Sequence, residues 1–313
     1  MRKRDILMAL LLFVVIGNSI FYIAILNPAG NGSKENYTLR GYHNPIRIES
    51  NSQLQQQADS EGWQGNGSAE NPYVIQDYFI DATGYSYGIY IGNVSLHLTI
   101  ENCTIENATL GSWNSGAIVF YSSSNVSIIN DKLRKSNYGI YLNSSSSIVI
   151  RSSMIYENSM AGVCIDSSSG NIIYNNYFNN TENVLFRGES SNTWSTEPDY
   201  GPNIIHGPLI GGNYWAKPDG SGYSETGTTN SMGFVSAYTL SPGNVDEHPL
   251  SRGGAISGDI TGCGYINRPG VYNITADFES DCKYGILIMA NDVELRGNGH
   301  WVNKSSTNGY GDT

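Results

Sequence analysis

GIYIGNVSLHLTIENCTIEN, residues 88–107, is the first of four similar segments that together decide the fold. The other three read GAIVFYSSSNVSIINDKLRK (116–135), GIYLNSSSSIVIRSSMIYEN (139–158) and GVCIDSSSGNIIYNNYFNN (162–180). They recur at a spacing of about 23 residues, and self-similarity at such a period is the signature of a stacked repeat architecture.

Apolar residues in each segment alternate with other residues, which is the period of a β-strand. With the initial glycines superposed, apolar columns form from Ile89, Ala117, Ile140 and Val163 and from Ile91, Val119, Leu142 and Ile165. Further columns contain Ile100, Ile128, Ile150 and Ile173, and Ile105, Leu133, Ile155 and Phe178. Each repeat therefore holds about three short strands, and stacking the repeats buries their apolar faces together.

Polar residues also align between the repeats. One column contains Asn102, Asn130, Ser152 and Asn175. Asn tolerates left-handed backbone and bonds neighbouring amides, so this column predicts a ladder at a corner of the coil. The serine runs 122–124, 144–147 and 167–169 fall at equivalent positions and are interpreted as loops.

This pattern resembles the right-handed parallel β-helix repeat family, in particular the NosD-like and related carbohydrate-binding or sugar-hydrolase group of archaeal surface proteins. The resemblance extends to residues 45–82, which look like an entry segment, and to NTWS (192–195) and the GGNYW string (211–215), which look like a closing segment. It implies an all-β, right-handed parallel β-helix with three strands and about 23 residues per coil.

The domain boundaries follow from these segments. We expect a parallel β-helix with its entry segment at 46–190, a closing segment at 191–250 and a linker at 251–258. Residues 259–313 resemble the start of a second, incomplete β-helix module, with Ile286, Ile288, Val293 and Leu295 alternating. Either a truncated reading frame or a terminal stub packed on the first module would explain why it stops.

The N-terminus predicts export. Three basic residues precede the apolar run 6–26, which as a helix is long enough to cross a bilayer. Residues 1–28 are thus a signal anchor or a cleaved signal peptide, followed by a linker at 29–45, and both alternatives stay open. Either way, the basic flank stays inside and the rest lies outside the cell, on its surface or secreted.

Export makes glycosylation and disulfide formation possible. Surface acceptor sequons are predicted at Asn31, Asn36, Asn66, Asn93, Asn107, Asn125, Asn143, Asn179, Asn273 and Asn303, whereas the sequon at Asn102 is expected to face inward. Cys263 and Cys282 lie close together in the exported part and predict a disulfide. Cys103 and Cys164 are about three coils apart, too far for a bond, and are expected to be thiols.

The net charge of −11 argues against nucleic acid as a partner, because phosphates would be repelled. The five histidines have no spacing typical of a metal site, and residues 226–240 lack the carboxylates of a calcium loop. We therefore expect no metal and no cofactor. The copper role of the NosD branch has no Cys, Met or His cluster to support it.

Outward carboxylates and cations do not gather into an obvious catalytic site. Glu106 and Arg134 share a column, as do Lys135 and Glu157, which is typical of pairing between coils. Asp131 and Arg151, in neighbouring coils, remain as weak catalytic candidates, but glycoside hydrolysis usually needs two carboxylates.

Tyrosines are the remaining clue, since the chain contains 22 of them. Tyr90, Tyr141, Tyr156 and Tyr174 are predicted to point outward and are weak candidates for ligand binding, although tyrosine is also an ordinary strand former. The favoured function is an exported structural or adhesive surface protein that contacts glycans or other envelope proteins and is either attached to the membrane by its N-terminal helix or secreted after cleavage. The alternative is a carbohydrate-active enzyme, either a polysaccharide lyase or a glycoside hydrolase.

Overall fold

The computed structural model describes residues 11–16, 19–24, 41–111, 114–230, 232–253, 255–256, 258–280, 286–288 and 290–304. The chain divides into two compact units, residues 1–41 and 42–313, which are described separately.

In the first unit, β1 (Leu11–Ile16) and β2 (Ser19–Ala24) pair as antiparallel strands. A helix was predicted over residues 6–26, and the described part of that run is not helical. The strands read LLFVVI and SIFYIA, which are rich in β-branched and aromatic residues that favour extended backbone. Among the described residues, no helix has the length and apolar character needed to span a membrane. The linker was predicted at residues 29–45, and its residues 29–40 lie outside the described residues.

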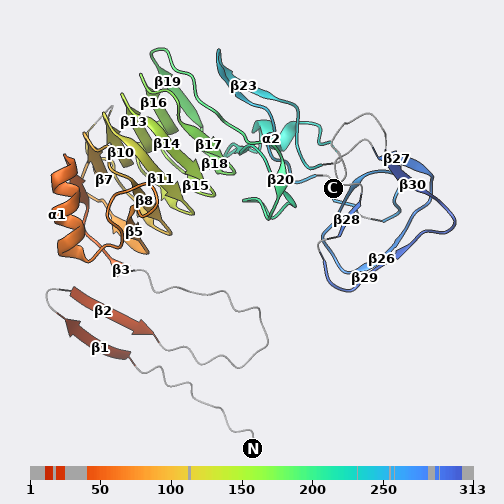
Figure 1. The fold of residues 1–313 in the computed structure, drawn as a ribbon, viewed down its shortest axis with the longest axis horizontal. Coiled ribbons are helices and arrows are strands. Elements are labelled where there is room, and N and C mark those ends of the chain that lie inside the picture. The colour runs from red at the N-terminus through yellow and green to blue at the C-terminus, as the bar shows by residue number, and fades with distance from the viewer. Residues whose placement is uncertain are drawn as a thin grey trace, which may run out of the picture. The chain divides into compact units, whose positions relative to one another are not determined.

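The second unit is built on three parallel sheets that run along a solenoid (Figure 1). A six-stranded sheet contains, in spatial order, β19 (Val184–Arg187), β16 (Ala161–Asp166), β13 (Tyr138–Asn143), β10 (Gly116–Tyr121), β7 (Tyr87–Gly92) and β4 (Ile46–Ile48). A five-stranded sheet contains β17 (Ile172–Tyr174), β14 (Ser146–Arg151), β11 (Ser124–Ile129), β8 (Leu98–Glu101) and β5 (Tyr73–Gln76). A seven-stranded sheet contains β22 (Tyr214–Ala216), β18 (Tyr177–Asn179), β15 (Met154–Tyr156), β12 (Lys132–Arg134), β9 (Thr104–Glu106), β6 (Tyr78–Asp81) and β3 (Gly41–Tyr42).

One strand of each sheet makes one coil, so the predicted parallel β-helix with three strands per coil is confirmed. Residues at the same corner of successive coils are 28 positions apart from Cys103 to Asp131, 22 from Asp131 to Ser153 and 23 from Ser153 to Asn176. A right-handed connection is the strong expectation for parallel strands, and the hand stays a prediction.

The strand register confirms two predicted columns and corrects two others. Ile128 pairs with Ile100 and Ile150, and Leu133 pairs with Ile105 and Ile155, as predicted. In the six-stranded sheet, however, Ile118 pairs with Ile89 and Ile140, and Phe120 pairs with Ile91 and Leu142. Ala117 and Val119 were therefore predicted one residue away from the true members of these two columns. The reason is that Gly116 pairs with Tyr87 and Tyr138, and not with the glycines that begin the neighbouring repeats.

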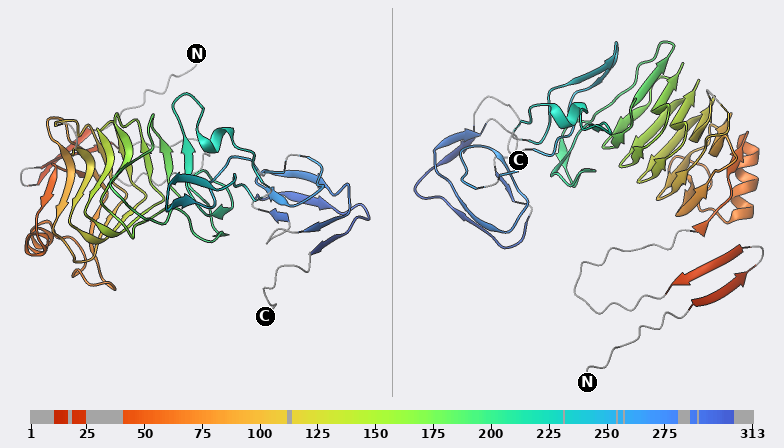
Figure 2. Two further views of the ribbon diagram at one scale, coloured as in Figure 1. Left: turned by 90° about the horizontal axis from the view of Figure 1, so that it is seen from above. Right: turned by 180° about the vertical axis from the view of Figure 1, so that it is seen from behind.

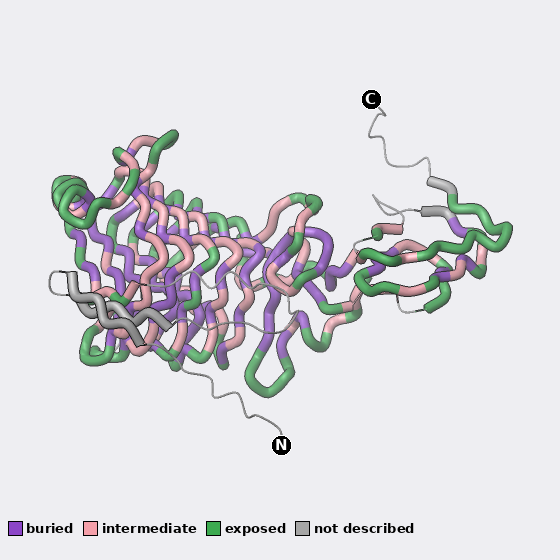
Figure 3. The backbone as a smooth tube through the Cα atoms, turned by 90° about the horizontal axis from the view of Figure 1, so that it is seen from below, coloured by how far each residue is buried: buried purple, intermediate pink, exposed green. Residues whose placement is uncertain are grey.

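The interior is a single apolar cluster that runs along the coils (Figure 3). Its N-terminal end is covered by α1 (Asn51–Glu61), which was not predicted, and which buries Leu54 and Ala58 against the first coil. The Ser50 side chain accepts a hydrogen bond from the Gln53 amide at the start of α1, and Gly62 ends the helix with φ of 71°. These capping signals were visible in the sequence.

The other end of the solenoid is covered by residues that follow β19. They include the antiparallel pairs β20 (Asp199–Tyr200) with β21 (Leu209–Ile210) and β23 (Tyr238–Ser241) with β24 (Asn244–Asp246), together with α2 (Tyr223–Thr226). Trp194 and Trp215 are fully buried in the central cluster at this end. They cover the last coil, as proposed for a closing segment.

Six more strands form three parallel pairs beyond the closing segment (Figure 2). The pairs are β25 (Gly264–Ile266) with β28 (Ile286–Ile288), β26 (Gly270–Asn273) with β29 (Val293–Arg296), and β27 (Phe278–Ser280) with β30 (Val302–Lys304). This is the strand arrangement of two stacked coils around a small apolar cluster of their own. The exact domain boundaries stay predictions.

Candidate functional site

Asp131 lies in the corner between the five-stranded and seven-stranded sheets and is 1% exposed. Its Oδ1 accepts a hydrogen bond of 2.6 Å from the Cys103 amide of the preceding coil, and its own amide donates to Ser153 Oγ of the next coil. The ladder continues through Asn176 and Asn213, each accepting the amide of the coil before it. Asp131 is therefore one member of the hydrogen-bonded ladder that connects successive coils.

Arg151 lies elsewhere, on the outer side of the five-stranded sheet, where it pairs with Ile129 and Tyr174. It is partly exposed, whereas Asp131 is enclosed within the corner. The structure thus places the two catalytic candidates in neighbouring coils, but not side by side on one surface.

The left-handed turn at each corner explains why the polar side chain that follows it, such as that of Asp131, points inward. Asn102, Asn130, Ser152 and Asn175 all have positive φ, between 55° and 58°, so the predicted polar column is a row of left-handed turn residues. Asn130 Nδ2 donates to Asn102 Oδ1 over 2.6 Å. Asn102 is only partly buried, so the expectation that it faces inward was wrong: the residues that follow the turn, beginning with Cys103, point into the coil.

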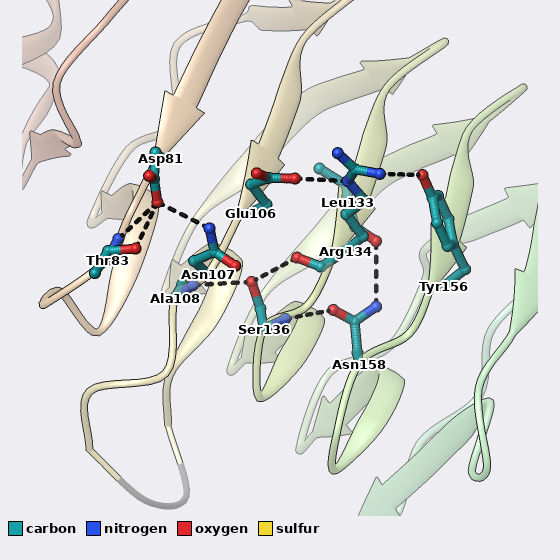
Figure 4. Close-up of polar contacts among 10 residues, drawn as sticks. All are labelled: Asp81, Thr83, Glu106, Asn107, Ala108, Leu133, Arg134, Ser136, Tyr156 and Asn158. Atoms are coloured by element: carbon teal, nitrogen blue, oxygen red, sulfur yellow. Dashed lines mark hydrogen bonds and ion pairs between the residues drawn. The ribbon is translucent and has the colours of Figure 1, made fainter.

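Equivalent ladders lie in the other two corners. Ser123, Ser145 and Ser168 are buried and connect successive coils through amide-to-hydroxyl hydrogen bonds. The serine runs interpreted as loops are therefore partly corner and partly strand, because Ser124 starts β11 and Ser146 starts β14. In the third corner, the Ala108 amide donates to Ser136 Oγ, and the Ser136 amide donates to Asn158 Oδ1 (Figure 4).

The outer side of the seven-stranded sheet carries a row of charged and aromatic residues (Figure 4). Arg134 Nε donates to Glu106 Oε2 over 2.6 Å, which confirms the predicted pairing of these two residues, and Arg134 Nη1 donates to the Tyr156 hydroxyl over 3.2 Å. Glu106 is thereby used to neutralise a cation. The same carboxylate is consequently poorly placed to act as one of a catalytic pair. The other predicted pair, Lys135 with Glu157, lies within the described residues and forms no ion pair.

The outer side of the six-stranded sheet carries a second buried cluster, formed by Val119, Tyr138, Tyr141, Ala161 and Cys164. The Tyr141 hydroxyl donates to Asp166 Oδ2 over 2.9 Å, and burial together with this bond raises the pKa of Tyr141 to about 12. Burial also raises the pKa of the Cys164 thiol to about 11. Since the thiolate is the nucleophilic form, Cys164 is not activated for catalysis.

The four tyrosines predicted to bind ligand lie on three different sheets. Tyr90 and Tyr141 are on the six-stranded sheet, Tyr156 on the seven-stranded sheet and Tyr174 on the five-stranded sheet. Tyr141 is 3% exposed, and the Arg47 guanidinium lies 4.3 Å from the centre of the Tyr90 ring. The four therefore do not form one binding surface.

The described residues offer no group of three or more His, Cys, Asp or Glu side chains that could hold a metal ion. Copper sites are typically built from thiolate, thioether and imidazole ligands. The Cys103 thiol points into the core and donates to the Glu101 carbonyl, and Cys164 is on an outer face. His43 and His300 each face a carboxylate, of Glu61 and Asp277 respectively. These donors do not converge, so they do not fit a copper centre.

The described sequons occupy corners, loops and strands. Asn66 and Asn93 are exposed, and Asn107, Asn125, Asn143, Asn179 and Asn273 are partly exposed. Asn31 and Asn36 lie outside the described residues, and only the backbone of Asn303 is described. Cys263 is disulfide-bonded, but its predicted partner Cys282 lies outside the described residues, so the pairing stays a prediction.

A buried carboxylate in the closing segment was missed from sequence. Asp246 is 0% exposed, and its Oδ2 accepts hydrogen bonds of 2.8 Å from the Asn213 amide and from Trp215 Nε1. Burial raises its pKa to about 7 despite these donors. No local pattern marks Asp246, because the residues that enclose it come from distant parts of the chain.

Comparison with known proteins identifies one family. Residues 29–220, more than half of the chain, match the family model described as "Periplasmic copper-binding protein (NosD)". No curated protein and no solved structure matches the chain.

Proposed function

Because the chain belongs to the NosD family, which is described as periplasmic and copper-binding, we propose that it is an exported β-helix protein that acts by binding and not by catalysis. Its proposed partners are glycans or other proteins of the cell envelope. The periplasmic description of the family supports the export that the N-terminal sequence predicts. Copper is left out of the proposal, because the described donors do not converge.

The observation that carries the proposal is the position of Asp131. A catalytic acid, base or nucleophile must reach the reacting atoms, with heavy atoms within about 3 Å. Asp131 instead accepts the Cys103 amide inside a corner and is 1% exposed. Its role in the ladder accounts for its presence without any reaction.

The outer faces of the solenoid support binding. Parallel strands place equivalent side chains about 4.8 Å apart from coil to coil, so an extended polymer can make the same contact repeatedly. On the six-stranded sheet, Tyr121, Asn143, Asp166 and Arg187 follow one another in such a row. Tyr121 is 48% exposed, so an aromatic side chain is accessible in a row with polar groups.

Attachment to the membrane through residues 6–26 and glycosylation of the exposed sequons belong to this proposal too. Both follow from export, and neither is needed for binding. Fractionating cells that express the full chain would distinguish a membrane-bound form from a secreted one, and enzymatic deglycosylation would show whether glycans are attached.

The proposal is tested by mixing the purified full chain with isolated envelope fragments and measuring how much protein sediments. Saturable co-sedimentation that is reduced by Tyr121→Ala is expected, and the exposed Tyr85→Ala serves as the matched control. Absence of saturable binding to any envelope fraction would contradict the proposal. The enzyme alternative is favoured only if the same preparations are degraded.

A further inference from the structure

A cavity of about 450 Å³ lies where the residues after the closing segment meet the second set of coils. Its lining includes Arg252 and Arg268, together with Asn267, Ile256 and Tyr272. Ligand sites in proteins usually have volumes of about 300 to 1,000 Å³ and combine apolar walls with a few polar groups. The volume of this cavity lies in that range, its lining is more polar than apolar, and its described lining contains two cations and no carboxylate.

The two arginines differ from others in this acidic chain. Arg47, Arg134 and Arg296 each lie within 2.8 Å of a carboxylate oxygen. Neither Arg252 nor Arg268 forms an ion pair with any described carboxylate, although the chain contains 28 acidic residues and only 17 lysines and arginines. Two guanidinium groups thus line one cavity, and no carboxylate in the described part of the chain pairs with either of them.

Both arginines are exposed, and tyrosines support the Arg252 side chain and the backbone that carries Arg268. The Arg252 guanidinium lies 5.4 Å from the centre of the Tyr214 ring, and that ring is buried and stacked on Tyr177 with centroids 5.5 Å apart. The Tyr272 hydroxyl donates to the Arg268 carbonyl over 3.2 Å and so closes the loop that carries Arg268. Such support reduces the conformational freedom that binding must remove.

We infer that this cavity binds an acidic saccharide, with Arg252 and Arg268 receiving its carboxylate or sulfate group. Guanidinium groups match the planar geometry of a carboxylate and can donate two hydrogen bonds to it. Ile256 and Val271 supply apolar surface for the C–H face of a sugar, and Asn267 supplies an amide for hydroxyl groups. The inference rests on the proposed glycan contact and adds a second site to the row of Tyr121 on the six-stranded sheet.

The test is calorimetric titration of the full chain with a digalacturonate, a neutral disaccharide of galactose, a sulfated disaccharide and inorganic sulfate. We expect an acidic disaccharide to bind, with affinity that falls as salt is added, and the neutral disaccharide to bind at least tenfold more weakly. Arg252→Gln and Arg268→Gln should each weaken binding about tenfold or more, since hydrogen bonds to charged groups are the strong ones. Arg296→Gln, which removes an exposed arginine outside the cavity, should leave binding unchanged.

Unfolding midpoints of the variants show whether the fold is intact. The inference is overturned if neither acidic disaccharide binds, if both cavity variants bind as the unaltered chain does, or if inorganic sulfate binds as tightly as the saccharides. Envelope binding that persists in both arginine variants while neither acidic disaccharide binds would overturn the cavity assignment and leave the proposed function standing, because that binding is assigned to the row of Tyr121. Loss of binding to every envelope fraction by the unaltered chain would instead contradict the proposed function.

Discussion

The indole ring of Trp215 lies parallel to the phenyl ring of Phe178, with ring centroids 4.7 Å apart and an interplanar angle of 6°. The two residues are register partners in adjacent strands of the seven-stranded sheet. Trp215 therefore continues the interior column of Ile105, Leu133, Ile155 and Phe178 and ends it with a large ring. The closing segment covers the solenoid by adding one more residue to a column of the repeat.

Replacing Trp215 with alanine should destabilise the protein strongly. A buried tryptophan truncated to alanine typically costs about 3 to 5 kcal/mol of unfolding free energy, and here Asp246 would also lose a donor. Urea unfolding followed by circular dichroism measures the change. Trp301→Ala, at a tryptophan that is 50% exposed, is the control and should have a small effect. Equal effects of the two substitutions would contradict this role of Trp215.

Replacing Asp131 with asparagine should destabilise the protein less than replacing it with alanine. Asn176 and Asn213, its equivalents in later coils, accept an amide and also donate to the carbonyls of Ile150 and Ile173. Asn at position 131 could make the corresponding pair of bonds, so we expect the unfolding free energy to be unchanged or to rise by about 1 kcal/mol. Asp131→Ala removes the acceptor of the Cys103 amide and should cost about 1 to 3 kcal/mol.

The matched experiment is Asn176→Asp, which places a carboxylate where Asn176 Nδ2 now donates to a carbonyl oxygen. It should lower the unfolding free energy at pH 7. If Asp131→Asn proved as harmful as Asp131→Ala, the ladder would not be the reason for this residue.

Gly139 should not accept a side chain beside Ile155. A Cβ atom at Gly139 would lie 2.4 Å from Ile155 Cγ2, so Gly139→Ala is expected to cost about 1 to 3 kcal/mol. In the preceding coil, Ala117 occupies the equivalent position beside Leu133, and leucine has no Cγ2 branch at Cβ. The double variant Gly139→Ala/Ile155→Leu should recover part of the loss.

The control for the glycine prediction is Gly262→Ala, because a Cβ atom there meets no atom within 4 Å. Thermal unfolding of the three variants provides the comparison. The same loss of stability in the single and double variants would show that contact with Ile155 is not the reason why position 139 requires glycine.

Asp246 should make stability depend on pH. Its pKa in the folded protein, about 7, is above the ordinary value of 3.8, so the folded state retains a proton that the unfolded state has lost. The contribution of this group is therefore most favourable at low pH and declines as pH rises from about 4 to about 7, by at most about 1.4 kcal/mol per pH unit.

Unfolding free energies of the unaltered chain and of Asp246→Asn, measured between pH 4 and 8, give the difference attributable to this carboxyl. The difference should fall with rising pH, whereas Asp199→Asn, at an exposed carboxylate, should leave the profile of the unaltered chain in place. Parallel profiles for the unaltered chain and Asp246→Asn would contradict the prediction.

The solenoid could be predicted from sequence because its evidence is local and repeated. The columns of Ile100 and Ile105 follow from strand periodicity, and their register holds in the structure. The column of Ile89 was assigned by superposing glycines, and that reasoning failed at Ala117, where a leucine neighbour permits a side chain in place of glycine.

The candidate site was harder to predict because corners interrupt the strand period. Asn130 has φ of 58°, and this left-handed residue turns the following Asp131 into the coil, which alternation along a strand cannot reveal. Asp246 depends on contacts with Asn213 and Trp215, which lie more than 30 residues earlier in the chain. The helix α1 was missed although Ser50 and Gly62 mark its ends, because it buries only Leu54 and Ala58 and so has a weak helical pattern of apolar residues.

Incubating the full chain with a panel of neutral and acidic polysaccharides, while measuring bound protein and newly formed chain ends together, tests the central claim most directly. We predict saturable binding with no new reducing or unsaturated ends, in the unaltered chain and in Asp131→Asn alike. Turnover by the unaltered chain that is lost in a folded Asp131→Asn variant would contradict it.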